Sequence, residues 1–315
     1  MPSHLSSLRL IFAGSGAFGA PTLMRLIERE TNVVQVFTQP DKPAGRGHAL
    51  TPTPIGKLAL ERGLNLIRTA DINREALPDA DLLLVIAFGQ KLAPQVVDHA
   101  RLGSINLHAS RLPSYRGAAP INWAVINGDA VTGNSVIRLA QTMDAGAVLA
   151  MSETPIGPRD TAGIIHDRLA AQGADLVEQV THDLMNGTAR EIPQDHARAS
   201  KAPKLSRASS VIDWTRDAES IARQIRGMSP WPGCRVELCA ADGSSLDRLT
   251  LMCATAEKEN TSARPGMIST SGLVGCGSGS LQIIDLHPDS KRATDWERYR
   301  NGKRLTGGET LRSIT

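Results

Sequence analysis

The sequence predicts an α/β protein in which a mostly parallel sheet covered by helices is followed by a small antiparallel β-barrel. Up to about residue 140, short apolar runs alternate with helical patterns, which is typical of parallel strands connected by helices. Beyond about residue 210, glycines break short apolar segments, which is typical of an antiparallel barrel. The length of 315 residues also favours two domains over one.

The strands and helices expected in the first part follow one another in a regular order. Apolar runs predict strands at residues 8–14, 33–38, 81–89, 104–110 and 134–140. Helical spacing, in several cases beginning at or near a proline, predicts helices at residues 21–30, 54–63, 94–100 and 119–128. The run at 81–89 is almost continuously apolar, so we expect that strand to be buried on both faces.

The second part begins after a stretch without periodicity. Residues 187–210 contain two prolines and several polar residues, which is typical of a linker. A helix is expected at 218–230, and short apolar segments then follow at 235–240, 249–256, 266–270, 272–280 and 281–286. We therefore predict a catalytic domain at 1–188, a linker at 189–208 and a C-terminal domain at 209–315.

Composition is typical of a folded globular protein, and the segments that would direct it to a membrane or out of the cell are not recognised. Apolar residues make up 41% of the sequence, which is ordinary for a globular protein. No apolar run approaches the roughly 20 residues of a membrane-spanning helix. The N-terminus lacks a basic start, a long apolar stretch and a small-residue cleavage site. We expect a cytoplasmic protein, a monomer, with no membrane partner.

The charge is small and unevenly distributed. The net charge is +3, and residues 201–315 hold 17 Lys and Arg against 13 Asp and Glu, whereas the preceding residues are nearly balanced. A polyanionic partner is one interpretation of this excess, and an ordinary solvated surface is the simpler one. Among the cysteines there is no C-x-x-C pair, so we expect buried thiols in a reducing compartment and no metal site; they are Cys234, Cys239, Cys253 and Cys276.

A glycine loop after the first expected strand suggests a nicotinamide or flavin site. The stretch GSGAFG at 14–19 fits the G-x-G-x-x-G pattern between a strand and a helix. Such a site needs an acidic residue at the end of the second strand, and this strand ends instead in Thr38 and Gln39. Asp41 comes later. The glycines are better explained by a tight turn, and we expect no NAD cofactor.

A group of polar side chains follows the strand expected at 104–110. Asn106 and His108 are two residues apart, so on a strand they project from the same face. They lie near the carboxyl end of that strand, where open α/β sheets bind ligands. Asp144 follows the next expected strand and precedes two small residues, which is also typical of a turn. Whether it meets His108 depends on the fold.

An amide donor, an imidazole and a carboxylate together suit acyl transfer. The Asn106 amide can donate to an oxyanion, which is worth roughly 3 kcal/mol in comparable sites. His108 can stabilise charge or relay a proton, and Asp144 can hold it in place. The sequence shows no obvious nucleophile elbow with Ser or Cys, so we expect direct attack by an amine of the substrate.

The stretch NLHASRLPSYRGAAP (106–120) resembles the signature N-x-H-x-S-L-L-P-x-x-R-G-x-x-P of the folate-dependent formyltransferase family. The match comprises Asn106, His108, Ser110, Leu112, Pro113, Arg116, Gly117 and Pro120. Arg111 replaces the more usual Leu, and Ala140 stands where many members carry an acidic residue four positions before the Asp. The resemblance implies a Rossmann-like formyltransferase domain with Asn106, His108 and Asp144 as catalytic residues.

The same resemblance implies the formyl donor and its pocket. The donor is 10-formyltetrahydrofolate, and no metal is required. The folate is expected to contact Phe88, Gly89, Gln90, Lys91, Ser110, Arg111, Leu112 and Pro113. Backbone groups of such loops can pair with a pterin, so side-chain changes there need not abolish binding. Arg116 and Gly117 are expected to shape the loop rather than react.

Two further segments are similar to the branch of the family that formylates initiator methionyl-tRNA. Residues 37–59 resemble the loop that grips the acceptor stem, with Arg46 as the main contact and Lys42 beside it. Residues 201–233 resemble the linker and the start of an OB-like domain that contacts tRNA, and the end of the chain is also similar. The basic balance of this region would then serve RNA binding.

Three alternatives remain open at this point. A formyltransferase acting on an amino-sugar nucleotide keeps the catalytic residues but gives Arg46 no role. A tRNA-binding protein without catalysis keeps Arg46 and the basic C-terminal domain but predicts no turnover. A nicotinamide dehydrogenase is the third.

Overall fold

The computed structural model describes residues 4–44, 49–257, 262–289 and 291–314. The chain forms two compact units, each assembled from three segments. The first unit contains Met1–Gly117, Gly133–Thr154 and His166–Lys201, and the second contains Ala118–Thr132, Pro155–Ile165 and Ala202–Thr315. The domain limits given above, at residues 188 and 209, stay a prediction. In the part described, no helix is both long and apolar enough to cross a bilayer.

The first unit is built on a seven-stranded sheet in the order β11-β10-β7-β6-β1-β2-β5. Five neighbouring strands are parallel, and β10 and β11 extend the sheet in antiparallel fashion beside β7. This arrangement confirms the mostly parallel sheet. The strands are β1 (Arg9–Gly14), β2 (Asn32–Thr38), β5 (Leu66–Arg68), β6 (Leu82–Ile86), β7 (Ser104–His108), β10 (Ser135–Arg138) and β11 (Val148–Met151).

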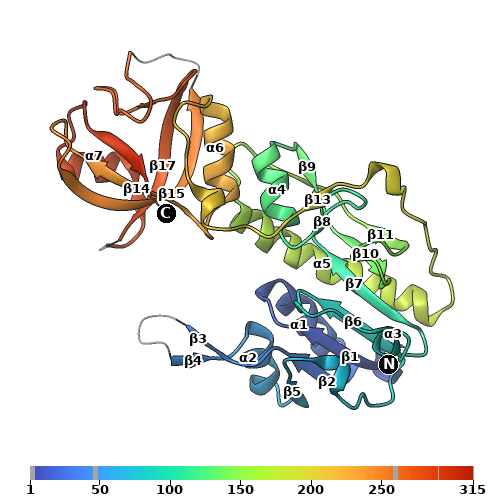
Figure 1. Cartoon of the computed structure of the whole chain (residues 1–315). Helices are drawn as coiled ribbons and strands as arrows, with labels where there is room; N and C mark the ends of the chain where they lie inside the picture. The colour runs from blue at the N-terminus through green and yellow to red at the C-terminus, as the bar shows by residue number, and fades with distance from the viewer. Residues whose placement is uncertain (1–3, 45–48, 258–261, 290, 315) are drawn as a thin grey trace. The chain divides into compact units, whose positions relative to one another are not determined.

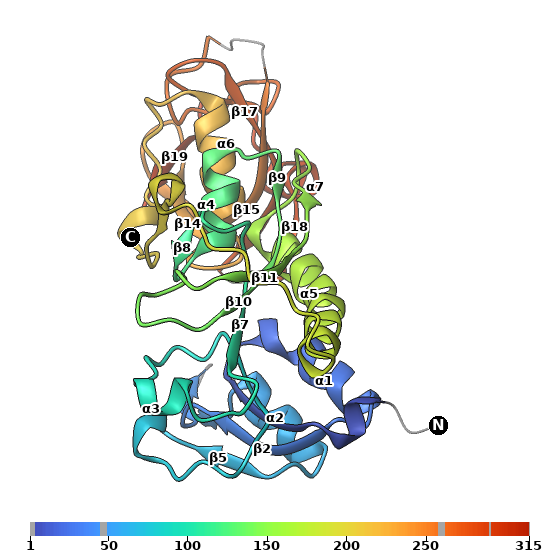
Figure 2. The same ribbon diagram turned by 90° about the vertical axis from the view of Figure 1, so that its right-hand side faces the viewer.

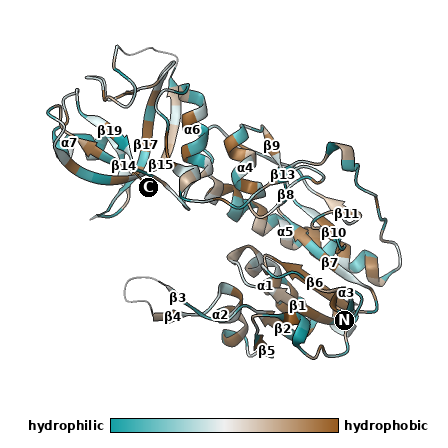
Figure 3. Ribbon diagram, viewed as in Figure 1, coloured by the Kyte–Doolittle hydropathy of each residue, from teal (hydrophilic) through white to brown (hydrophobic). Residues whose placement is uncertain are grey.

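Helices cover both faces of this sheet because its central strands are apolar on both sides (Figures 1 and 3). On one face, Ile11 and Ala13 of β1 join a core cluster that includes Val96 of α3. The opposite face includes Leu107 of β7, against which Gly173 of α5 packs. Every residue of β6 is buried, as the sequence predicts. The helices of this unit are α1 (Ala20–Glu28), α2 (Pro54–Glu61), α3 (Pro94–Val97) and most of α5 (Ala162–Met185).

Helices α5 and α1 lie side by side (Figure 2), and ion pairs attach one to the other. The Arg25 guanidinium lies 2.6 Å from Asp175 and 2.9 Å from Glu178, and Arg29 lies 2.7 Å from Glu178. These carboxylates raise the pKa of Arg25 through hydrogen bonds and Coulomb attraction. The 24-residue α5 is the largest element that the sequence analysis did not predict.

A β-hairpin replaces the loop expected between the second strand and the second helix. Strands β3 (Lys42–Ala44) and β4 (Ala49–Thr51) pair in antiparallel fashion and project from the first unit (Figure 1). Three short two-residue strands, β8 (Arg116–Gly117), β9 (Val131–Thr132) and β12 (Thr154–Pro155), form small ladders elsewhere. The ladder of β8 with β13 (Lys201–Ala202) lies beside the candidate site.

The second unit is a curled antiparallel sheet in the order β16-β17-β15-β14-β19, with β18 beside β17. Single bridges from Met267 to Thr310 and from Ile268 to Val274 connect its two edges, as expected for a small OB-like barrel. The sequence predicted its main strands but not its last strand or its last helix. Its elements are α4 (Pro120–Asn127), α6 (Ala218–Gly227), β14 (Cys234–Cys239), β15 (Ser245–Glu257), β16 (Val274–Gly275), β17 (Ser280–Pro288), β18 (Thr294–Asp295), α7 (Trp296–Lys303) and β19 (Thr310–Ser313).

One apolar core holds this unit together. It joins the barrel strands with the buried faces of α6 and α7, and Trp123 of α4 packs against it. All four cysteines are free and buried, as predicted. Burial raises the pKa of Cys234 to about 12 and that of Cys276 to about 11, so both are thiols at neutral pH.

Candidate active site

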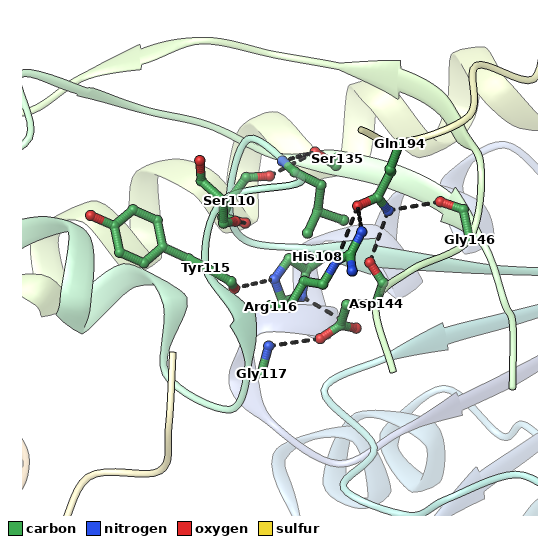
Figure 4. A network of polar contacts seen from close by, with 11 residues as sticks. His108, Ser110, Tyr115, Arg116, Gly117, Ser135, Asp144, Gly146 and Gln194 are labelled. Carbon is green, nitrogen blue, oxygen red and sulfur yellow. Dashed lines mark hydrogen bonds and ion pairs between the residues drawn. The ribbon is translucent and has the colours of Figure 1, made fainter. Parts of the chain in front are cut away.

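The candidate site begins at the carboxyl end of β7, where His108 is almost completely buried. Its Nε2 lies 2.9 Å from the Tyr115 carbonyl oxygen (Figure 4). Because a carbonyl oxygen only accepts hydrogen bonds, Nε2 carries the proton, and Nδ1 of the neutral ring is an acceptor. Nδ1 lies 3.7 Å from Oδ1 of Asp144, so the structure brings these two predicted residues together. This distance exceeds that of a direct hydrogen bond and leaves both atoms able to receive a proton.

Asn106 lies two residues before His108, and the strand geometry puts both side chains on the same face. In the sheet it is paired with Val85 of β6 and Ile137 of β10. Leu107, between them, packs against α5 on the opposite face. Among the described residues, the Asn106 carboxamide has no hydrogen-bond partner, so its NH₂ group can donate to a ligand.

Asp144 lies in the turn between β10 and β11 in a left-handed conformation, with φ of 54°. Its Oδ2 accepts a 2.8 Å hydrogen bond from the Gly117 backbone N–H, so one carboxylate oxygen is anchored and the other faces His108. Gly117 has φ of 127°, a conformation that glycine adopts without strain. This contact gives Gly117 of the signature a role in orienting the carboxylate.

A glutamine that the sequence analysis missed supports this turn from behind. The Gln194 Nε2 donates to the carbonyl oxygens of Asp144 at 2.8 Å and Gly146 at 2.7 Å (Figure 4). Its Oε1 accepts from the Arg116 guanidinium at 2.6 Å and 3.1 Å. Gln194 lies in the segment interpreted as a linker, and no pattern around it indicates a site. Only the folded chain brings it to Asp144.

A second network fixes the loop after β7. The Ser135 hydroxyl donates to the Ser110 carbonyl at 2.7 Å and accepts from the Leu112 N–H at 3.0 Å. The Ser110 hydroxyl donates to the Ser114 carbonyl at 2.6 Å.

Leu112 packs in a small cluster with Ile137 and Val148, and Pro113 follows a cis peptide bond. Arg111, which replaces the usual Leu, forms an exposed ion pair with Glu153.

The other loop predicted to bind folate follows β6, the neighbour of β7. The Phe88 ring is buried, and its carbonyl accepts from the Gln39 amide at 2.8 Å. Gly89 has φ of 75°, which favours glycine.

Both ends of the Gln90 amide are engaged, with Ile72 N and Thr69 O, so Gln90 shapes the loop. Lys91 is exposed at the edge of a surface depression of about 650 Å³.

The glycine loop after β1 is a tight turn whose backbone N–H groups are already engaged within the protein. The Ser15 and Gly16 N–H groups, which would face a pyrophosphate in such a site, both donate to the Ala87 carbonyl. At the end of β2, Thr38 bonds to the Thr53 hydroxyl at 2.6 Å. A β-carbon on Gly14 would lie 2.8 Å from the Ile86 carbonyl oxygen, so close packing requires that glycine.

Of the two residues predicted to contact tRNA, only Lys42 is placed. It lies exposed on β3, where its Nζ donates to Oε1 of Gln39 at 2.8 Å. Arg46 lies outside the described residues, in the interval between β3 and β4. Among the residues described, no group of three His, Cys, Asp or Glu side chains is arranged to hold a metal ion.

Comparison with known proteins shows the family of this chain. The model of the formyl transferase family matches residues 8–181, and the model of the formyl transferase C-terminal domain matches residues 204–304. The chain belongs to the formyl transferase family. It is 38% identical to a methionyl-tRNA formyltransferase of Geobacter metallireducens, over 98% of this chain and 99% of that protein. It is 37% identical to the enzyme of the same name from Geobacter sulfurreducens, over 98% of each chain.

Solved structures of other formyltransferases share the fold. The N-formyltransferase of Helicobacter canadensis, solved with folinic acid and dTDP-3-aminofucose, superposes with a TM-score of 0.65. The match covers 88% of this chain and 98% of that one, at 16% identity. This likeness supports the family's fold in both units. The nearly full-length likeness to methionyl-tRNA formyltransferases is much stronger at the level of sequence.

Proposed function

We propose that this member of the family transfers the formyl group of 10-formyltetrahydrofolate to the α-amine of initiator methionyl-tRNA. The observation that carries the chemistry is the Asp144 carboxylate 3.7 Å from a buried imidazole, beside an Asn106 amide on the same strand face. The full-length similarity to methionyl-tRNA formyltransferases supports the acceptor. The sugar formyltransferases among the structural neighbours are similar only in fold, so they do not favour a sugar acceptor.

The reaction follows from the functional groups. The amine nitrogen attacks the formyl carbon, and the carbonyl electrons move to its oxygen. The Asn106 amide donates to this oxyanion. The attacking nitrogen loses a proton to the pair formed by His108 and Asp144, directly or through water. With that proton on Nδ1, the imidazole is protonated at both nitrogens, and its positive charge stabilises the oxyanion. The intermediate then collapses, and N10 of tetrahydrofolate leaves and takes up a proton.

The two loops after β6 and β7 would hold the folate. Their side chains are largely engaged within the protein: Gln90 with two backbone groups, Ser110 with a carbonyl and Arg111 with Glu153. The Phe88 and Ser110 carbonyls and the Leu112 N–H are also engaged within the protein, so the proposed partners for the pterin are the other backbone groups of these loops. We also propose that Lys42 and Arg46 contact the acceptor stem, since Lys42 lies on the projecting β3–β4 hairpin.

The deciding experiment is formyl transfer from 10-formyltetrahydrofolate to charged initiator tRNA, with wild type, His108→Ala and Arg46→Ala side by side. We expect turnover by wild type and a large loss of kcat in His108→Ala, with tRNA binding unchanged. Arg46→Ala should be severely impaired in formyl transfer because it binds tRNA poorly. Absence of transfer by wild type would overturn the assignment of methionyl-tRNA as the acceptor. Full activity of His108→Ala would overturn the mechanism.

A further inference from the structure

The Gln194 side chain connects a cation to the loop that carries Asp144. It is buried, and its amide oxygen is held by two nitrogens of Arg116. The orientation of the amide is therefore unambiguous, because a guanidinium only donates and must face the oxygen. The NH₂ group then points to the Asp144 and Gly146 carbonyls (Figure 4).

We propose that Gln194 is a positioning residue for the formyl transfer, holding Asp144 at its working distance from His108 through the two hydrogen bonds that its amide donates. This inference rests on the proposed function, in which Asp144 takes part in proton transfer. Gln194 does not touch the reacting groups itself. It bonds to the backbone carbonyls on both sides of Ala145. It therefore fixes the position of the Asp144 main chain, from which the side chain extends, and does not change the charge of the carboxylate.

The turn needs such a support because its backbone is strained at Asp144. Asp144 has φ of 54°, a left-handed conformation that is strained for most residues with a β-carbon. Gly146 packs so closely on β10 that a β-carbon would collide with the Arg138 carbonyl. Without Gln194, the carbonyls of Asp144 and Gly146 lose this donor, and among the described residues the Gly117 N–H is the one remaining hydrogen bond that positions the Asp144 side chain.

Arg116 strengthens the support in two ways. Its two hydrogen bonds prevent the amide from flipping, and a charged donor on the amide oxygen polarises the NH₂ group toward its acceptors. Arg116 precedes Gly117, so one two-residue strand supplies both the anchor of Gln194 and the N–H that holds Asp144. The signature pair Arg-Gly thus acts on the carboxylate from two sides.

Two substitutions separate the donating role from the role of partner to Arg116. Gln194→Glu keeps an acceptor for Arg116 but loses both donated hydrogen bonds, and Gln194→Met has neither. We expect both to lower kcat by about 100-fold, as a displacement near 1 Å in a site can do. The KM values for folate and tRNA should stay within about threefold, because Gln194 contacts neither proposed binding loop.

Matched controls come from another glutamine of the first unit. The Gln35 Nε2 also donates to two backbone carbonyls, those of Asn65 at 2.9 Å and Val36 at 3.2 Å, on the far strands of the sheet. Gln35→Glu and Gln35→Met therefore remove the same kind of contact away from the site. We expect them to keep wild-type kcat, while thermal unfolding reports any loss of stability in all four variants.

The decisive measurement is single-turnover formyl transfer by a double-mutant cycle of Gln194→Met with Asp144→Asn. If Gln194 acts through Asp144, its substitution should cost about 100-fold in wild type and less than about threefold in the Asp144→Asn background. Equal costs in both backgrounds, or a wild-type kcat for Gln194→Glu, would overturn the inference while the proposed function stands. Full activity of Asp144→Asn alone would instead overturn the role of Asp144 in the proposed function.

Discussion

Asp144 in the first unit and Asp247 in the second are equally exposed, at 13% of the side chain each, yet they are held in opposite ways. Asp247 Oδ2 is bonded to Lys303 at 2.8 Å and to the Tyr299 hydroxyl at 2.9 Å, and its Oδ1 accepts from the Arg248 N–H. Asp144 has one anchored oxygen, and its other oxygen faces an imidazole nitrogen at 3.7 Å.

The difference shows how a partly buried carboxylate becomes structural or reactive. Each oxygen of Asp247 has a donor, so the group is a stable anion that attaches α7 to the barrel. Asp144 is held mainly through its backbone, by Gln194, and keeps one oxygen for chemistry. The same residue type therefore stabilises one unit and is proposed to serve the reaction in the other. Four experiments test this comparison.

The largest effect is expected from Asp144→Asn. Asparagine tolerates the left-handed backbone and keeps an acceptor for Gly117, so the fold should persist. The loss of the negative charge should lower kcat for formyl transfer by roughly 1,000-fold, within the range of general acid–base residues. Steady-state kinetics and a thermal unfolding scan check this together. A stability loss that accounts for the lost activity would show that Asp144 resembles Asp247 after all.

The reverse outcome is expected for Asp247→Ala. Removing a carboxylate that accepts hydrogen bonds from a charged group and a buried phenol should lower the free energy of unfolding by about 2 kcal/mol. The kcat for formyl transfer should stay at the wild-type value. Urea unfolding measures the first quantity and the formyl-transfer assay the second. A drop in kcat without a change in stability would contradict the structural role.

The Asp247 carboxylate also predicts how stability responds to acid. Burial acts to raise the pKa of Asp247, but hydrogen bonds from Lys303 and Tyr299 outweigh it and leave the pKa below its ordinary value. A lowered pKa means that the stabilisation is fully present above the unfolded-state pKa of about 3.9 and is lost as the pH falls below it. The stability difference between wild type and Asp247→Asn should therefore be constant from pH 5 to 7 and shrink below about pH 4. A difference that grows on acidification would have the wrong sign.

The smallest effect is expected at Arg111, whose ion pair with Glu153 is exposed at both ends, at 43% and 65%. Such a pair contributes less than about 1 kcal/mol. Arg111→Leu restores the family's usual residue and should change the free energy of unfolding by no more than this. The KM for 10-formyltetrahydrofolate should stay within about threefold, because backbone groups are proposed to bind the pterin. A tenfold rise would show that the guanidinium itself contacts folate.

The sequence predicted more of the first unit's sheet than of its covering. The strands ending at Gly14, Thr38, Ile86 and His108 are rich in apolar residues, and each appears near its expected place. The sequence analysis did not predict the long α5 because its apolar residues are interspersed with many polar ones. The sheet face against which α5 packs determines which side of the helix is buried. The pairing of β3 with β4 was not predicted because it depends on contacts between two three-residue strands rather than on an apolar pattern.

By itself, the sequence determined that Asn106 and His108 share one face at the end of a buried strand, because the period of a β-strand is two residues. It also determined the chemistry of this pair and its likeness to one enzyme family. Only the tertiary structure decided that Asp144 comes within 3.7 Å of His108, with Gly117 and Gln194 holding it. The physical reason is that these contacts join residues 27 to 50 positions apart, and only the packed sheet brings such distant residues together.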